Sequence, residues 1–118
     1  MESRHTIHYS VIVPAYKENG NIRPLVTRIF TALRRIDSPV PAEQTEVIIV
    51  DDNSRDGSVE TVQALRQEGY NVRIIVRTTE RGLSSAVVRG FQEAMGDNML
   101  CMDADLQVCS FLQNVCCL

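Results

Sequence analysis

The sequence predicts an α/β fold, a parallel sheet of about four strands with helices on both of its faces. Two observations lead to this prediction. Near-continuous apolar runs, which are typical of strands buried on both faces, alternate with segments whose apolar residues recur every three to four positions. The alternation begins and ends with a strand, as right-handed crossover units in one sheet require. A chain of 118 residues is long enough for one such domain.

The first predicted strand is an apolar run at residues 9–14. One face of the helix that follows is apolar, formed by Ile22, Leu25, Val26, Ile29, Phe30 and Leu33. Asn21 is the predicted N-cap, and Pro24 falls in the first turn, where its missing N–H costs little. The turn-rich segment 37–42 predicts that this helix ends near Ile36.

The remaining elements follow the same alternation. Residues 45–51 predict the second strand, and the turn residues after it predict a helix that ends near Glu68 and is closed by Gly69. Residues 71–76 predict the third strand. After a loop, amphipathic spacing predicts a third helix at 83–94, and the fourth strand is predicted at 98–103.

Composition excludes several function classes. The formal net charge of -3, the 5% aromatic content and the absence of Trp argue against nucleic-acid binding. The first residues lack the apolar core of a signal peptide, and no window approaches the ~20 apolar residues of a transmembrane segment. The 4 cysteines lack the paired spacing of a zinc site. These features predict reduced thiols and a cytosolic or cytosol-facing location.

Acidic residues follow three of the predicted strands. Ligands of parallel sheets bind outside the carboxyl ends of the strands, so these side chains are expected to share one edge. They are Glu18, Asp51, Asp52, Asp56, Asp103 and Asp105. Such a cluster needs a bound cation or hydrogen-bond donors to be tolerated.

The D-x-D at Asp103 and Asp105 is the strongest candidate for metal binding. Mg²⁺ and Mn²⁺ prefer oxygen ligands, and Mg²⁺ is often held by one or two carboxylates together with substrate phosphates. A metal there would neutralise a diphosphate leaving group. The alternative is that both are ordinary turn and helix-capping residues.

Three further features have both a functional and a structural interpretation. Tyr16 has a ring that can stack on a base or sugar, but it is equally a surface tyrosine near a helix start. Asp52 and Glu18 can accept hydrogen bonds from a nucleotide, or they can stabilise helix N-termini. The segment R-G-L-S-S-A at 81–86 can bind phosphate through backbone N–H groups, or it can simply begin a helix.

Four segments together resemble the family 2 glycosyltransferases with the GT-A fold. They are V-I-V-P-A-Y-K-E-N-G-N-I (11–22), V-I-I-V-D-D-N-S-R-D-G-S (47–58), R-G-L-S-S-A-V-V-R-G (81–90) and M-D-A-D-L-Q (102–107). The resemblance implies a Rossmann-like GT-A nucleotide-binding half over residues 9–107, after an N-terminal tail at 1–8. The absence of G-x-G-x-x-G after the first strand counts against an NAD enzyme.

The resemblance also implies a set of site residues. Pro14, Tyr16, Glu18, Val50 and Asp52 would contact a guanine nucleotide. Asp103, Ala104 and Asp105 would bind the diphosphate, Asp103, Asp105 and Gln107 would bind Mg²⁺ or Mn²⁺, and Asp105 would be catalytic.

Within that family the segments are most similar to the dolichyl-phosphate mannosyltransferases. This similarity implies transfer of mannose from GDP-mannose to dolichyl phosphate, giving dolichyl phosphate mannose for protein glycosylation and GPI-anchor synthesis. It also implies membrane-anchoring partner subunits and a peripheral position on the cytosolic face of the endoplasmic reticulum. An acceptor phosphate is already anionic near neutral pH, so catalysis would rest on positioning and charge stabilisation.

Residues 108–118 depart from the family pattern. They contain three of the four cysteines and no charged side chain. The polar turn, the acceptor-binding half and the basic phosphate clamp expected after Gln107 are replaced by this tail. We therefore expect little or no transferase activity from the chain alone, and a cytosolic location for such a truncated form.

Three other interpretations stay open. One is a polyprenyl-phosphate glucosyltransferase that uses UDP-glucose, and another is a non-catalytic nucleotide-binding fragment that regulates the full-length enzyme. The third is a phosphatase or phosphoacceptor with a D-x-D nucleophile. It is disfavoured because such enzymes place the key Asp after the first strand, where this chain has P-A-Y-K-E.

Overall fold

The computed structural model describes residues 7–17, 19–35, 42–79 and 82–102, and it confirms the predicted α/β architecture. The elements are β1 (Tyr9–Ala15), α1 (Asn19–Leu33), the short 3₁₀ helix η1 (Ala42–Gln44), β2 (Thr45–Asp51), α2 (Ser58–Gln67), β3 (Val72–Val76), α3 (Leu83–Glu93) and β4 (Asn98–Cys101). The four strands form one sheet in the order β3-β2-β1-β4, and all three pairings are parallel.

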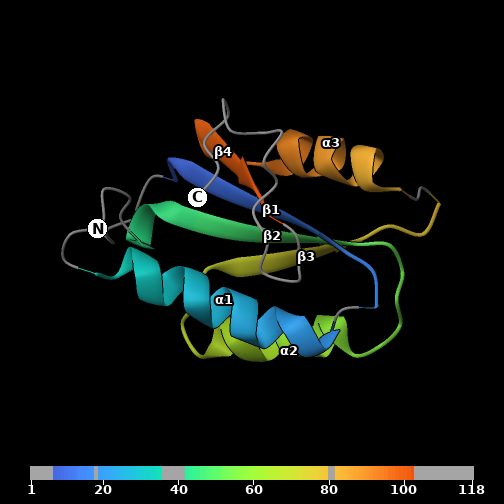
Figure 1. Cartoon of the computed structure of the whole chain (residues 1–118), viewed down its shortest axis with the longest axis horizontal. Coiled ribbons are helices and arrows are strands. Elements are labelled where there is room, and N and C mark those ends of the chain that lie inside the picture. The colour runs from blue at the N-terminus through green and yellow to red at the C-terminus, as the bar shows by residue number, and fades with distance from the viewer. Residues whose placement is uncertain (1–6, 18, 36–41, 80–81, 103–118) are drawn as a thin grey trace, which may run out of the picture.

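Helices cover both faces of the sheet, as predicted. Figure 1 shows α1 and α2 together on one side and α3 by itself on the other. Successive side chains of a strand point to opposite faces, so β1 serves two cores. Val11 and Val13 pack with the apolar residues of α1 and α2, whereas Ile12 packs in a second cluster with Ala86 of α3.

The second core depends on a close approach between α3 and β1. Gly90 lies in the buried face of α3, and a Cβ atom at this position would overlap Cγ2 of Ile12. Only glycine therefore lets the helix lie this near to the strand.

The strand order produces a switch point beside β1. The connections through α1 and α2 place β2 and β3 on one side of β1, whereas the connection through α3 places β4 on the other side. In open α/β sheets the crevice at such a reversal, outside the carboxyl ends of the strands, is the usual ligand site.

Three boundaries differ from the sequence prediction by two residues or more: both ends of α1 and the end of β4. Helix α1 ends at Leu33, three residues before the predicted end near Ile36. Helix α1 begins at Asn19, two residues before the predicted N-cap at Asn21, because the carboxylate of Asp56 accepts a hydrogen bond from the Asn19 N–H at 3.1 Å. This partner comes from a distant loop, so local sequence could not indicate it. Strand β4 ends at Cys101, and Met102 after it forms a single β-bridge.

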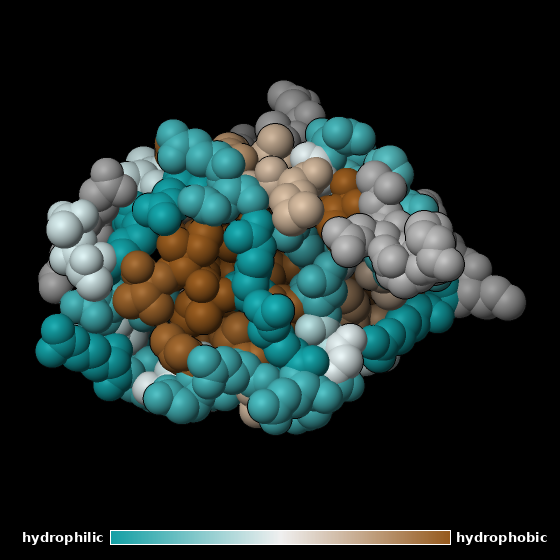
Figure 2. All heavy atoms as spheres, turned by 180° about the vertical axis from the view of Figure 1, so that it is seen from behind, coloured by the Kyte–Doolittle hydropathy of each residue, from teal (hydrophilic) through white to brown (hydrophobic). Residues whose placement is uncertain are grey.

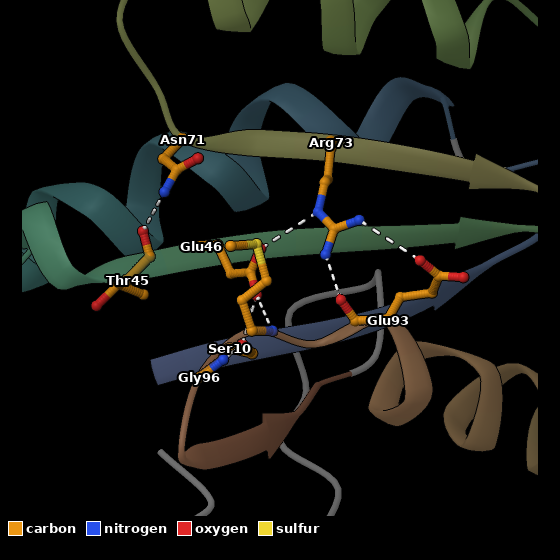
Figure 3. A network of polar contacts seen from close by, with 8 residues as sticks. Ser10, Thr45, Glu46, Asn71, Arg73, Glu93 and Gly96 are labelled. Carbon is orange, nitrogen blue, oxygen red and sulfur yellow. Dashed lines mark hydrogen bonds and ion pairs between the residues drawn. The ribbon is translucent and has the colours of Figure 1, made fainter. Parts of the chain in front are cut away.

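A buried carboxylate joins three strands at the amino ends of the sheet. Glu46 is 3% exposed and forms an ion pair with Arg73 on the neighbouring strand, with Nε and Oε1 3.2 Å apart. Figure 3 shows the network, in which Arg73 also bonds to the carbonyl oxygen of Glu93 at the end of α3.

Part of the surface is apolar. Figure 2 shows a brown area bordered by polar side chains on the side that faces away from the viewer in Figure 1. The exposed large apolar side chains of the described chain are Tyr16, Val76, Leu83, Val88 and Met95. Within the described ranges, no helix has both the length and the hydropathy needed to cross a membrane.

Candidate functional site

The carboxyl ends of three strands lie level with one another. Ala15 of β1 pairs with Asp51 of β2, and Asp51 pairs with Val76 of β3. Backbone hydrogen bonds continue past these ends, from the Asp52 N–H to the Ala15 carbonyl (3.2 Å) and from the Arg77 N–H to the Asp51 carbonyl (2.8 Å). The loops that follow the strands are therefore held side by side at one edge.

Three of the residues that the family resemblance suggests for nucleotide contact lie at this edge with different exposure. Tyr16 directly follows β1 and is 46% exposed, and the Lys17 ammonium lies over its ring, 5.4 Å from the ring centroid. Pro14 is buried within β1. Val50 is fully buried and packs in the α3-side core with Ile12 and Ile48, so its side chain offers no surface to a nucleotide. The nucleotide contacts of all three residues stay predictions.

The loops after β1 and β2 contain unusual backbone conformations. Lys17, Asn53 and Arg55 have φ angles of 56°, 63° and 56°, in the left-handed region that favours glycine. The Lys17 N–H donates to Ser54 Oγ at 2.6 Å, which ties the two loops together. Conformations of this kind gather at binding and catalytic sites, where surrounding contacts hold them in place.

A hollow of about 290 Å³ lies beside these loops. Among its lining residues are Asn53 and Arg55 of the β2–α2 loop, Glu60 of α2 and Val76 of β3. It is close to the lower limit of the volumes of small-molecule pockets.

Two of the predicted acidic residues have structural roles. Asp51 is 2% exposed and accepts hydrogen bonds from the backbone N–H and the hydroxyl of Ser54, so it shapes the loop after β2. Asp56 accepts bonds from the Asn19 N–H and from both the N–H and the hydroxyl of Ser58, the first residue of α2. From the sequence, the acidic cluster is expected to need either a bound cation or hydrogen-bond donors. For Asp51 and Asp56, the structure supplies hydrogen-bond donors.

The contacts of Asp56 alter its acidity. Burial alone would raise the pKa of this carboxyl group. The hydroxyl of Ser58 and the N–H groups of Asn19 and Ser58 outweigh burial, and they lower the pKa of Asp56 below its ordinary value. Asp56 is therefore stabilised in its ionised form, in which it joins the starts of α1 and α2.

Asp52 lies where the sequence places it, directly after β2, but sequence reasoning missed its partner. The Arg77 guanidinium, which is buried, donates to Asp52 Oδ1 at 2.7 Å, and the Gly82 N–H donates to Oδ2 at 3.1 Å. The sequence did contain one sign of this partner. Arg77 directly follows the apolar run of β3, and a charged side chain that is buried at such a position usually has a partner of opposite charge.

The remaining predicted residues lie outside the described residues. They are Glu18, Asp103, Ala104, Asp105 and Gln107, together with Arg81 at the start of the candidate phosphate-binding segment. The described chain ends at Met102, whose N–H donates to the Ile12 carbonyl of β1 at 3.0 Å. Within the described ranges, no three or more His, Cys, Asp and Glu side chains gather in a way that could hold a metal ion.

The chain is similar to named mannosyltransferases. Over 98 residues it is 72% identical to dolichol-phosphate mannosyltransferase of Mycosarcoma maydis, and over 102 residues it is 65% identical to the enzyme of that name from Saccharomyces cerevisiae. These matches cover 83% and 86% of this chain but only 33% and 37% of the relatives. The chain therefore spans about a third of the length of these curated relatives.

Solved structures share the fold. A mannosyltransferase from Pyrobaculum calidifontis in complex with GDP-Man and Mn²⁺ has a TM-score of 0.72 and 24% identity, and the match covers 92% of this chain and 30% of that one. The TarS protein of S. aureus in complex with UDP-GlcNAc has a TM-score of 0.70 and 26% identity, with coverage of 84% and 27%. Both matches agree with the GT-A prediction.

A family model agrees with these similarities. The model described as glycosyl transferase family 2 matches residues 10–109, which include the four strands and the three α-helices of the structure except for Tyr9, the first residue of β1. The chain belongs to glycosyl transferase family 2.

Proposed function

We propose that this chain supplies the nucleotide-binding part of an enzyme that transfers mannose from GDP-mannose to dolichyl phosphate. The observation that carries the proposal is the 72% identity to a dolichol-phosphate mannosyltransferase over 98 residues. Identity falls to 32% over 99 residues for an undecaprenyl-phosphate 4-deoxy-4-formamido-L-arabinose transferase of Pseudomonas fluorescens. Because the chain spans a third of its relatives, the activity and the acceptor belong to the proposal.

The described residues have the chemistry that a nucleotide site needs. The exposed ring of Tyr16 offers a stacking surface for a base, and the carboxylate of Asp52 offers an acceptor for a base or ribose donor. Tyr16 follows β1 and Asp52 follows β2, and the ends of these two strands are level. A hydrogen bond from the Asp52 N–H to the Ala15 carbonyl joins the two chain segments there. A nucleotide that lay across these loops would contact both side chains.

The proposed metal is Mg²⁺ or Mn²⁺, held by Asp103, Asp105 and Gln107. Their side-chain oxygens are the donor type that both ions prefer, so the residue chemistry fits. When bound, the ion would offset the charge that develops on the departing diphosphate. The related fold from Pyrobaculum calidifontis accommodates GDP-Man and Mn²⁺ together.

The proposed acceptor determines how the rest of the site works. A lipid phosphate is already anionic, so the chain needs no strong general base, and its task is to hold the donor sugar in line with the acceptor. Asp105 is proposed to position the donor diphosphate. We propose the cytosolic face of the endoplasmic reticulum as the place of action, with membrane-anchoring subunits as partners, because the acceptor is a membrane lipid.

Calorimetry with the purified chain tests the proposal. We expect GDP to bind more tightly than UDP, and its affinity to fall when Mn²⁺ and Mg²⁺ are removed by chelation. Tighter binding of UDP would favour a UDP-glucose-dependent glucosyltransferase, which the relatives do not favour. If neither nucleotide binds, the proposal is wrong.

A transfer assay tests the second part. Because the chain covers only a third of its relatives, we expect little or no transfer of radiolabelled mannose to a polyprenyl phosphate by this chain alone. Robust turnover would show that these residues suffice for both substrates.

A further inference from the structure

The Asp52 carboxylate is held on both of its oxygens. Its Oδ1 lies 2.7 Å from two nitrogens of Arg77, Nε and Nη2, and its Oδ2 accepts the Gly82 N–H at 3.1 Å. A carboxylate has about four acceptor positions, so these contacts leave about one, on Oδ2. The Asp52 side chain is 13% exposed, so it is not sealed from solvent.

Arg77 reaches beyond Asp52 to the start of α3. Its Nη1 donates to Ser85 Oγ at 2.9 Å, and its Nη2 donates to the Gly82 carbonyl at 3.1 Å. The side chain is only 1% exposed, and its backbone N–H bonds to Asp51 at the end of β2. One guanidinium group therefore connects the ends of β2 and β3 with the first turn of α3.

The chemistry of arginine makes this connection rigid. The guanidinium is planar, keeps its charge at every physiological pH and presents its donors in a fixed fork. A buried ion pair of this kind is sensitive to a change in the shape of either side chain, because a donor that moves away leaves the carboxylate without a compensating charge. Lysine keeps the charge but cannot make the same set of bonds.

We propose that Arg77 is the positioning residue of the nucleotide site, which holds Asp52 so that a single acceptor position on Oδ2 faces one N–H or O–H donor of the bound nucleotide. This inference rests on the proposed function for the identity of the ligand. Arg77 itself has no role in the transfer step. Its effect on binding passes through Asp52 and the start of α3.

Calorimetric titration with GDP and Mn²⁺ tests the positioning role. We expect Arg77→Lys to bind GDP about tenfold more weakly, which is the usual effect of losing one hydrogen bond to a charged group. Asp52→Asn should weaken binding by a similar factor. The double variant should bind no more weakly than the weaker single variant, because both substitutions disturb one unit.

The matched control is Arg73→Lys. Arg73 also pairs with a carboxylate of β2, that of Glu46, but at the other end of the sheet. A general loss of stability would affect both arginine variants, so we expect Arg73→Lys to lower the melting temperature and to leave GDP affinity unchanged. Unchanged affinity in Arg77→Lys, or additive losses in the double variant, would overturn the inference.

A second measurement needs no nucleotide. In NMR spectra of the ligand-free chain, we expect a slowly exchanging Arg77 Nε–H signal that disappears in Asp52→Asn, and a Gly82 amide signal that shifts in Arg77→Lys. If wild type shows these signals but binds no GDP or UDP, the proposed function is wrong, whereas the bonds from Arg77 and Gly82 to the Asp52 carboxylate are confirmed. If the Arg77 Nε–H exchanges freely in wild type, the positioning role is wrong.

Discussion

Ser10 Oγ donates a 2.6 Å hydrogen bond to Oε2 of Glu46, and both side chains are buried between α3 and the amino ends of β1 and β2. The same hydroxyl accepts the Gly96 N–H at 2.9 Å, and Glu46 accepts the Met95 N–H at 2.7 Å. This pair therefore fixes the turn that leads from α3 into β4, and Figure 3 shows how it connects to Arg73.

The first prediction concerns Glu46. Replacement by alanine should lower the free energy of unfolding by about 3 kcal/mol, because it leaves the Ser10 hydroxyl, the Met95 N–H and the Arg73 Nε–H without the acceptor that they share. Glu46→Gln keeps an acceptor oxygen and should cost less. Urea denaturation measures both values. Since Glu46 lies at the end of β2 opposite Asp52, GDP affinity should not change, and a large change would contradict the separation of these two networks.

The second prediction concerns the contact between α3 and β1. Gly90→Ala should lower the free energy of unfolding by about 1–3 kcal/mol, because the new methyl group overlaps Ile12. The cost should shrink in a chain that also carries Ile12→Ala. The control is Gly20→Ala in α1, where nothing lies within 4 Å of the added Cβ, and where alanine should stabilise the helix by up to about 1 kcal/mol. Equal effects at the two glycines would contradict the packing argument.

The third prediction is a pH dependence. The pKa of Asp56 is lower in the folded chain than in the unfolded chain, so its stabilising effect is complete above the ordinary value of about 4 and is lost as the pH falls through the folded pKa. Asp56→Asn should flatten the loss of stability in this acidic range. Ser58→Ala removes one donor to Asp56 and should give an intermediate profile. Identical profiles in urea denaturation for wild type and Asp56→Asn would rule out this contribution.

The fourth prediction concerns the D-x-D. Asp103→Asn and Asp105→Asn should each abolish the dependence of GDP binding on Mn²⁺, because they remove carboxylate ligands. The control is Asp97→Asn, which removes an 81% exposed carboxylate that contacts only His8 among the described residues. Calorimetry with and without chelator measures the effect. If the two variants retain the Mn²⁺ dependence of wild type, the ligand assignment is wrong.

The sequence predicts the order of the strands and α-helices correctly, because the spacing of apolar residues is a local property of the chain and the folded structure buries the same residues. The elements β2 and α3 illustrate this, since an unbroken apolar run and a helical stripe determine them. The predictions that differ depend on contacts between distant segments. The start of α1 at Asn19 needs the Asp56 carboxylate. The sequence also yields no prediction for Glu46, whose buried carboxylate is bonded by Ser10 and Arg73 from two neighbouring strands.

The candidate site shows the same limit. Sequence reasoning finds Asp52 and Tyr16 because strand ends can be recognised. It cannot show that Arg77 occupies most of the acceptor capacity of Asp52, since 25 positions separate the two residues. It also cannot show that the side chain of Val50 points into the α3-side core, because residues 47–50 of β2 are all apolar and give no preference for either face.

The pairing of β1 with β4 has a consequence for how the protein is made. Asn98 donates its backbone N–H to the carbonyl of His8, a residue 90 positions earlier. A ribosome must therefore synthesise most of the domain before β1 acquires its second neighbour, and closing so long a loop slows the step. Until then the mostly apolar β1 is an open edge that can pair with other chains. We expect nascent chains at this stage to depend on chaperones, and the crevice beside β1 to form last.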